Sequence, residues 1–291
     1  MKAVLFRVHG GTDKLSYEDL PVPTIGPEEV LVRVKACALN HLDIWIRQGN
    51  PAYPMPLPHV SGSDVAGIVE QVGNGVEGVM VGERVFVSPG ISCWKCEQCL
   101  AGRDNLCRSY GLLGAMMHGG YAEYVKVPFR NVLPIPENLS FDQAAAFPLV
   151  SVTASHMLFA LAGLQHGETV LIMGAGSGVG MMAIQMAKLA GARVLTTVGS
   201  DDKIPKAVTL GADAVINHVK EKVAERVKLL TQGRGVDVVI EHIGPEVWDT
   251  CLHSLGKGGR LITCGATTGT EVMLDLRYVY SRQLTIKGSY M

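Results

Sequence analysis

Four cysteines lie close together in the segment SCWKCEQCLAGRDNLC. Cys93, Cys96, Cys99 and Cys107 have the spacing C-x2-C-x2-C-x7-C, which lets a short loop wrap one tetrahedral zinc ion. Two disulfides are the alternative, but no secretory signal peptide follows Met1, and a reducing cytoplasm disfavours disulfides. We therefore expect a cytoplasmic protein with one structural Zn2+ in a lobe at residues 90–110, and four thiolate ligands leave that metal no open position for catalysis.

The segment MGAGSGVG at 173–180 is a candidate phosphate-binding loop. Glycines let the backbone approach a pyrophosphate at the N-terminus of the following helix. A strict G-x-G-x-x-G does not match, because Ala175 and Ser177 occupy two glycine positions, and a purely structural tight turn is the alternative. The apolar strand before the loop and the helical pattern after it favour a dinucleotide site. Its expected members are Gly174, Ala175, Gly176, Ser177, Gly178, Val179 and Gly180.

The end of the next strand indicates which dinucleotide binds. An NAD-specific site usually carries an acidic residue at this strand tip, about twenty residues after the glycines. Here the strand ends at Val198-Gly199-Ser200, and Asp201, Asp202 and Lys203 follow. Ser200 can donate to a 2′-phosphate and Lys203 can neutralise it, so we expect NADP(H) to be preferred over NAD(H). Alternatively, Asp201 only caps the next helix.

The two halves of the chain have different patterns. Eleven of the 14 prolines lie between Pro21 and Pro136, among short segments of strand character. This spacing predicts an all-β, barrel-like domain. Its expected strands are KAVLFRV, EEVLVRVKACAL, DVAGIVEQVG, ERVFV and AEYVKVP.

After about residue 150, apolar strands alternate with helical segments. The expected strands lie at 169–175, 193–199, 214–218, 236–244 and 259–265, with QLTIKGSY as a sixth. The expected helices are 179–191, IPKAVTLG, VAERVKLLT and the segment from Trp248 to Leu255. Runs of β-branched residues alternating with helices predict a doubly wound parallel sheet, covered on both faces.

Length and composition limit the class of protein. A chain of 291 residues favours two domains, which we place at 1–150 and 151–291. The net charge of −1 offers no basic excess for nucleic acid. Residues 143–167 lack Asp, Glu, Lys and Arg, but they contain Pro148 and several Ser, Thr and His residues, so we expect a buried helix and no membrane span.

Together these features resemble the medium-chain dehydrogenase/reductase superfamily, which includes zinc alcohol dehydrogenases and quinone oxidoreductases. The zinc lobe, VSGSDVAGIVEQVGNGV, GGYAEYVKVP and the cofactor half carry the resemblance. It implies an α/β protein with an N-terminal GroES-like barrel and a C-terminal Rossmann domain, a small-molecule substrate and a homodimer. It also implies cofactor contacts from His41, Thr153, Gly265 and Ala266. Members continue for a few dozen residues that return to the first domain, and we expect that segment to be absent here.

Departures from the zinc alcohol dehydrogenase pattern concern its catalytic metal. In ALNHLDIWIRQG, Asn40 stands at a cysteine ligand, Leu42 at the proton-relay Ser/Thr and Trp45 at the relay histidine. The G-H-E segment becomes Gly62-Ser63-Asp64, and the last cysteine falls at or next to Leu149. An amide, a hydroxyl and a leucine cannot replace two thiolates and an imidazole. The pattern resembles the zinc-free quinone oxidoreductases instead.

We therefore expect hydride transfer from NAD(P)H to a quinone, enone or enoyl-type acceptor without catalytic zinc. Asn40, Ser63 and Tyr53 are the expected catalytic contacts. One alternative is an alcohol dehydrogenase with a metal site rebuilt from Asp64 with His41, Asp43 or His59. Another is a cofactor-binding protein without turnover.

Overall fold

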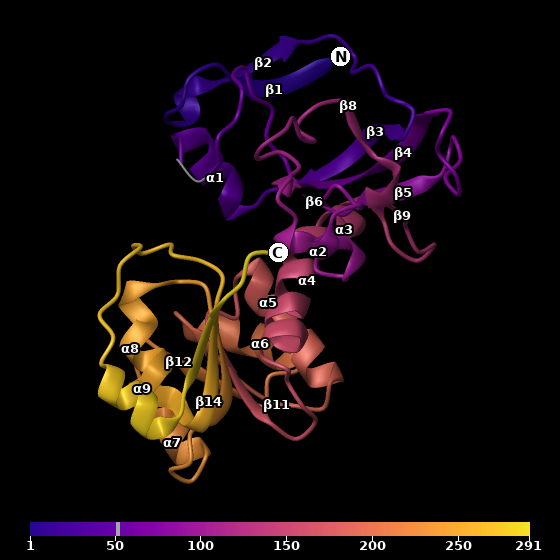
Figure 1. The fold of residues 1–291 in the computed structure, drawn as a ribbon. Coiled ribbons are helices and arrows are strands. Elements are labelled where there is room, and N and C mark those ends of the chain that lie inside the picture. The colour runs from indigo at the N-terminus through magenta and orange to yellow at the C-terminus, as the bar shows by residue number, and fades with distance from the viewer. Residues whose placement is uncertain (51–52) are drawn as a thin grey trace. The chain divides into compact units, whose positions relative to one another are not determined.

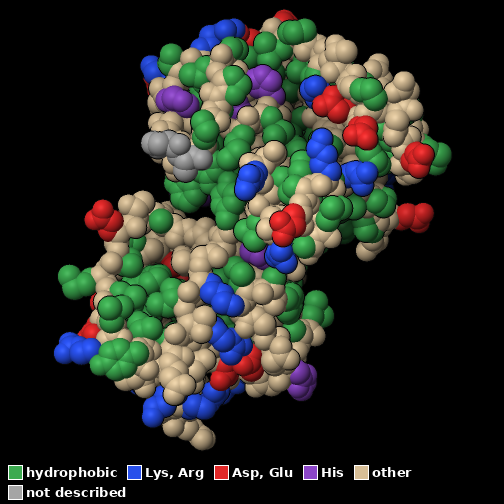
Figure 2. All heavy atoms as spheres, in the orientation of Figure 1, with side chains coloured by type: hydrophobic (Ala, Val, Ile, Leu, Met, Phe, Trp, Pro, Cys, Tyr) green, Lys and Arg blue, Asp and Glu red, His purple; other side chains and the backbone are tan. Residues whose placement is uncertain are grey.

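The computed structural model describes residues 1–50 and 53–291, which form two compact units, Met1–Leu149 and Val150–Met291. Figure 1 shows the strand-rich first unit and the second unit with its helices around one sheet. On the face of the described residues seen in Figure 2, basic and acidic side chains are intermixed, in keeping with the near-zero net charge.

The first unit is built on an antiparallel sheet with the order β8-β3-β4-β5-β9. Valines that alternate along these strands form its core, among them Val30, Val32, Val65, Val69 and Val85. The strands are β3 (Glu29–Ala38), β4 (Asp64–Val72), β5 (Arg84–Val87), β8 (Tyr124–Pro128) and β9 (Val132–Pro134).

Smaller elements surround this sheet. The hairpin of β1 (Lys2–Phe6) and β2 (Leu15–Asp19) is antiparallel, as is the short pair β6 (Gly90–Ile91) and β7 (Gly111–Leu112). The helices are α1 (His41–Gln48), α2 (Glu97–Leu100) and α3 (Phe141–Ala145), and single 3-10 turns lie at Thr12–Lys14, Asp104–Leu106 and Phe129–Asn131. The segment between β6 and β7 carries α2 and the four clustered cysteines.

The second unit contains a six-stranded parallel sheet in the order β12-β11-β10-β13-β14-β15. In chain order this is 3-2-1-4-5-6, the doubly wound arrangement that brings loops after the first strands to one edge for dinucleotide binding. The strands are β10 (Thr169–Ile172), β11 (Arg193–Val198), β12 (Ala214–Asn217), β13 (Val236–Glu241), β14 (Leu255–Thr263) and β15 (Thr285–Gly288).

Helices cover this sheet, and two separate hydrophobic clusters pack against it. The helices are α5 (Gly178–Leu189), α6 (Ile204–Thr209), α7 (Val223–Leu230), α8 (Pro245–Ser254) and α9 (Leu276–Arg282), with a 3-10 turn at Asp201–Lys203. The predicted α/β fold class is thus confirmed, and the strands β2, β6, β7 and β9 and the helices α1, α2 and α9 are additions to the predicted elements.

The uncharged segment at 143–167 is divided among α3, α4 (Pro148–Ser155) and a π-helical turn, His156–Leu161. Within residues 1–50 and 53–291, no helix combines the length and the apolar character that a membrane crossing requires.

Candidate functional site

The four predicted metal ligands meet at one point of the first unit. The Sγ atoms of Cys93, Cys96, Cys99 and Cys107 all lie within 4.8 Å of one another. Cys96 and Cys99 are 3.5 Å apart, Cys93 and Cys107 3.4 Å, and Cys93 and Cys99 3.9 Å. A tetrahedron of sulfurs around zinc has edges of about 3.8 Å, whereas a disulfide bond is about 2.05 Å long. No disulfide joins any of the four, and this donor set fits a tetrahedral zinc ion.

Backbone N–H groups favour thiolates at this cluster. The N–H groups of Cys93 and Ser109 donate to the Cys107 Sγ at 3.5 and 3.4 Å. Hydrogen bonding, first of all from the Lys95 backbone, lowers the pKa of Cys93 to about 6, while burial raises the pKa of Cys99 to about 12. Removal of the remaining protons on metal binding is the usual requirement for a zinc–thiolate site.

A second group of polar side chains joins β3, α1 and β4 in the first unit. The Asn40 Nδ2 donates to Asp64 Oδ2 at 2.8 Å, and the Leu149 N–H donates to Asp64 Oδ1 at 2.8 Å. The Asn40 N–H donates to Asp43 Oδ2 at 2.8 Å, and the Tyr121 hydroxyl donates to the same oxygen at 2.7 Å. Asp64 thereby fixes the side chain of Asn40 and Asp43 fixes its backbone.

Burial dominates the electrostatics of this network. Asp64 is 1% exposed. Burial raises its pKa to about 6, in spite of the bonds from Asn40 and Leu149 that favour its charged form. Burial also raises the pKa of Asp43, and burial together with the neighbouring Asp43 raises that of Tyr121, which keeps the phenol protonated and able to donate. Two carboxyl groups are therefore held close to one another, and among the described residues no Lys, Arg or His forms an ion pair with either of them.

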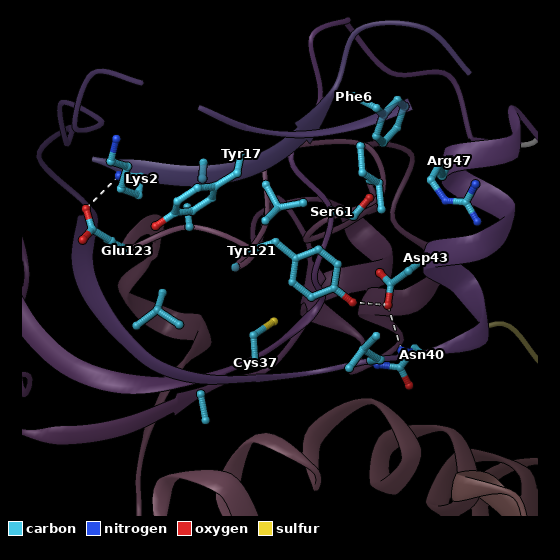
Figure 3. Close-up of a pocket in the computed structure, with 18 of the residues that line it drawn as sticks. Lys2, Phe6, Tyr17, Cys37, Asn40, Asp43, Arg47, Ser61, Tyr121 and Glu123 are labelled. Atoms are coloured by element: carbon cyan, nitrogen blue, oxygen red, sulfur yellow. Dashed lines mark hydrogen bonds between the residues drawn. The ribbon is translucent and has the colours of Figure 1, made fainter. Parts of the chain in front are cut away.

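An open cavity of about 930 Å³ lies beside this network, within the first unit. Figure 3 shows Asn40, Asp43, Tyr121 and Cys37 along one side of it. Apolar side chains form most of its wall, including Phe6, Leu15, Val34, Leu39 and Ile44.

His41 and Arg47, both on α1, also line this cavity. The predicted cofactor ligand His41 begins α1, and its ring lies edge-on to Trp45 with centroids 4.9 Å apart.

The structure places the other expected contacts of this unit differently. Ser63 directly precedes Asp64 and is fully buried, and its hydroxyl has no hydrogen-bond partner among the described residues. Tyr53 lies just after the residues outside the described ranges, and its N–H donates to the Asn50 carbonyl at 3.0 Å. His59 is fully buried and its Nε2 lies 3.0 Å from the Gly114 carbonyl. Tyr121, the partner of Asp43, was not among the expected residues.

The predicted phosphate loop has the expected place in the second unit, between β10 and α5. Gly174 has φ +70°, which favours glycine, and its N–H donates to the Thr197 hydroxyl at 2.9 Å. A Cβ on Gly180 would lie 2.2 Å from the Gly174 carbonyl oxygen, whereas one on Gly176 would meet only the Lys203 side chain, at 4.0 Å. The loop is thus packed tightly beneath α5 and is open at Gly176, where a pyrophosphate needs the space.

Ser177 is the N-cap of α5, and its hydroxyl accepts the Gly180 N–H at 2.9 Å. Gly178 begins the helix in contact with Val150, since a Cβ there would lie 2.8 Å from the Val150 side chain. Val179 packs against the hydrophobic cluster of this face, while Ala175 is buried and donates its N–H to the Thr197 carbonyl.

The strand tip of β11 presents basic groups. Ser200 precedes the turn Asp201–Lys203, and the Lys203 side chain reaches Gly176. Asp201 is bonded to Asn217 at 2.6 Å and paired with Lys220, so its charge is compensated. The His218 ring lies against Gly199, at 3.3 Å from a Cβ built there. His218 was not predicted, because it is brought to this site by the pairing of β11 with β12.

The remaining expected cofactor contacts, Gly265, Ala266 and Thr153, lie in the loop after β14 or on α4. Gly265 leaves no room for a side chain, because a Cβ would lie 2.6 Å from the His242 carbonyl oxygen. Ala266 accepts the Gly269 N–H at 3.3 Å. Thr153 is buried on α4. His242, between Gly265 and the phosphate loop, was not among the predicted residues.

The doubly wound sheet, the open glycine loop at its switch point and the thiol cluster on a barrel-like unit define a dinucleotide-using oxidoreductase. The family model of the alcohol dehydrogenase GroES-like domain matches residues 26–137, and that of the zinc-binding dehydrogenases matches 178–291. The chain therefore belongs to the medium-chain dehydrogenase/reductase superfamily, and it is an oxidoreductase of that superfamily.

Individual relatives differ in the reaction that their names give. The sorbitol dehydrogenase of Bacillus subtilis (strain 168) is 34% identical over 100% of this chain and 82% of its own length. A quinone oxidoreductase of Rattus norvegicus is 33% identical, over 94% of this chain and 75% of its own. A crystal structure of an NAD-dependent alcohol dehydrogenase is 48% identical and superposes with a TM-score of 0.96, covering 100% of this chain and 85% of that one.

Proposed function

We propose that this protein reduces a quinone or a conjugated carbonyl compound, such as an enone or an enoyl thioester, with NADPH and without catalytic zinc. The observation that carries this proposal is the pair of bonds from Asn40 and Leu149 to Asp64. By the family pattern, these three residues stand at or beside ligand positions of the catalytic metal. Here each oxygen of the Asp64 carboxylate accepts a hydrogen bond from a residue that cannot serve as a thiolate ligand.

The donor set supports the same proposal. Among the described residues, only the four cysteines bring three or more His, Cys, Asp or Glu ligand atoms close enough to share a metal ion. An alcohol dehydrogenase would need a metal site rebuilt from Asp64 with Asp43, His41 or His59. Among the described residues, these side chains do not form a cluster comparable to that of the cysteines. His59 instead lies beside the Gly114 carbonyl in a fully buried position.

The chemistry of the acceptor fits these residues. Alcohol oxidation requires loss of a hydroxyl proton of very high pKa, which a metal solves by binding an alkoxide. A quinone or an enone is already electrophilic, and its developing oxyanion needs only positioned donors. Asn40 is half-buried at the wall of the cavity, and one N–H of its amide is taken by Asp64. Its second N–H is the donor that we assign to the acceptor oxygen.

NADPH, when bound, supplies the hydride. We assign its pyrophosphate to the loop Gly174–Gly180 and its 2′-phosphate to Ser200 and Lys203, with His218 as a third polar neighbour. The bonds of Asp201 to Asn217 and Lys220 offset its charge, which lessens its repulsion of a 2′-phosphate. The structural zinc ion would be held by the four cysteines. We further propose a cytoplasmic homodimer.

An NAD-dependent alcohol dehydrogenase is the second candidate, because the 48% identical solved structure carries that name. A steady-state screen separates the two reactions. NADPH oxidation is followed at 340 nm with quinones and enones, and NAD(P)+ reduction is followed with primary and secondary alcohols, each with and without a chelator. The proposal predicts chelator-resistant reduction of a quinone or an enone. Alcohol oxidation that the chelator abolishes would replace it with the second candidate.

A further inference from the structure

The imidazole of His242 lies against the predicted phosphate loop. His242 directly follows β13, which pairs with β10, the strand that leads into the loop. Its Nε2 lies 3.0 Å from the Ser177 Oγ and 3.1 Å from the Met173 carbonyl oxygen. A Cβ on Gly174 would lie only 3.5 Å from the Cε1 and Nε2 of the same ring. The ring therefore contacts the loop both by packing and by hydrogen bonding.

The partners of this ring determine which atom donates. The Met173 carbonyl can only accept, so the His242 Nε2 must carry a proton to bond to it. The Ser177 hydroxyl donates to the Gly174 carbonyl at 2.9 Å and accepts the Gly180 N–H at 2.9 Å. Because the Ser177 hydroxyl proton is already donated to Gly174, its oxygen can only accept a hydrogen bond from His242. One Nε2–H is therefore shared by Met173 and Ser177.

The backbone of His242 is tied to the second cofactor loop. Its carbonyl oxygen accepts the Thr267 hydroxyl at 3.2 Å and lies directly against Gly265. The buried carboxylate of Glu241 accepts the N–H groups of Ile243 and Gly244, which fixes the turn after β13. His242 is thus held rigidly by its own strand end while its side chain supports the neighbouring loop.

We infer that His242 is a positioning residue for dinucleotide binding, which holds the Ser177 cap so that the loop Gly174–Gly180 stays shaped for a pyrophosphate. This inference rests on the proposed cofactor site and extends it by a residue 65 positions away in sequence from Ser177. A pyrophosphate is common to NADPH and NADH, so His242 acts on both cofactors alike. Lys203, in contrast, acts on the 2′-phosphate that only NADPH carries.

The test uses two variants of His242 that separate hydrogen bonding from packing. His242→Phe keeps a flat ring against Gly174 but removes the donor, whereas His242→Gln retains an N–H near the position of Nε2. Dissociation constants for NADPH and NADH are measured by quenching of tryptophan fluorescence. Loss of one neutral hydrogen bond predicts that His242→Phe weakens both cofactors by about five- to tenfold, with His242→Gln restoring most of the affinity.

A double-mutant cycle with Ser177→Ala shows whether His242 acts through the cap. We expect the double variant to bind no more than about twofold more weakly than the poorer single variant, because both changes remove one shared interaction. Fully additive losses, or wild-type affinity in His242→Phe, would overturn the inference while leaving the cofactor site intact. Wild-type protein that binds neither dinucleotide would overturn the proposed function as well.

A 15N NMR spectrum of the histidine ring nitrogens tests the inference even if His242→Phe does not fold. In the 15N-labelled wild-type protein near pH 7.5, we expect the Nε2 of His242 to carry the proton and its resonance to shift in Ser177→Ala. A neutral ring protonated only at Nδ1, or a resonance that Ser177→Ala leaves unchanged, would contradict the inference.

Discussion

Replacement of Asp64 by asparagine tests the electrostatics of the candidate site quantitatively. Burial raises the pKa of Asp64 to about 6 in the folded protein, while an aspartate in an unfolded chain titrates near its usual value of about 3.9. Between these values the native state retains a proton that the unfolded state has lost. The free energy of unfolding therefore falls as the pH rises through this window, and the full cost is present above pH 7.

The size of the effect follows from the shift. About two units of pKa at 1.36 kcal/mol each amount to about 3 kcal/mol, and about half of this develops between pH 5 and pH 8. Asp64→Asn has no such titration. Relative to the wild type, the variant should gain about 3 kcal/mol in free energy of unfolding from below pH 4 to above pH 7, whatever constant offset the altered hydrogen bonds to Asn40 and Leu149 add.

Urea unfolding at pH 5, 6, 7 and 8 provides the measurement. Asp64 belongs to the unit Met1–Leu149, so the transition to follow is the one reported by Trp45 and Trp94. Asp19→Asn is the matched control, since Asp19 is exposed and paired with Lys2 at the surface. The difference between Asp19→Asn and the wild type should change little over this pH range.

The reasoning would be refuted if the difference in free energy of unfolding between Asp64→Asn and the wild type changed with pH in the opposite direction. If Asp64→Asn became progressively less stable than the wild type as the pH rose, the carboxylate would be stabilised as an anion. A bound cation beside Asp64 would have that effect, and the proposal of a site without catalytic zinc would then fail. A flat difference would show that the Asp64 pKa is not raised.

Three further changes test separate parts of the site. Asn40→Ala should lower kcat for quinone or enone reduction by about 10- to 1000-fold at unchanged zinc content, as expected for loss of an oxyanion donor; an unaltered kcat would remove Asn40 from the reaction. Lys203→Ala should weaken NADPH binding, measured by fluorescence titration, and leave NADH nearly unaffected; equal losses would mean that the 2′-phosphate is not bound there. Cys96→Ser should lower the midpoint of thermal unfolding of the first unit, monitored by circular dichroism, because a metal-bound folded state is stabilised by its ligands; an unchanged midpoint in metal-replete buffer would argue against a structural ion.

Patterns that are local in sequence predicted the fold well. The β-branched runs at 169–175 and 193–199 became β10 and β11, because strands buried on both faces leave a continuous apolar signal. β2 (Leu15–Asp19) gave no such signal, since none of its residues is fully buried. The helix α9 likewise has no fully buried residue, and it was not predicted.

In the candidate site, too, features that are local in sequence were predicted and long-range contacts were not. The four cysteines lie within fifteen positions of one another, so their spacing alone predicted the cluster. The bonds from Asn40 and Leu149 to Asp64 join residues 24 and 85 positions apart, and only the folded sheet brings them together. Asn40 was expected as a catalytic contact, but its bond to Asp64 could not be predicted from the sequence. His242 was missed for the same reason.

The central claim is that this protein uses zinc for structure and not for chemistry, and the zinc content per chain tests it most directly. Wild-type protein and Cys99→Ser are exchanged into metal-free buffer, and their zinc is measured by inductively coupled plasma mass spectrometry beside quinone or enone reduction with NADPH. The account predicts one zinc ion per chain in the wild type, none in Cys99→Ser, and turnover that does not depend on added zinc. Two zinc ions in the wild type and one in Cys99→Ser would contradict it.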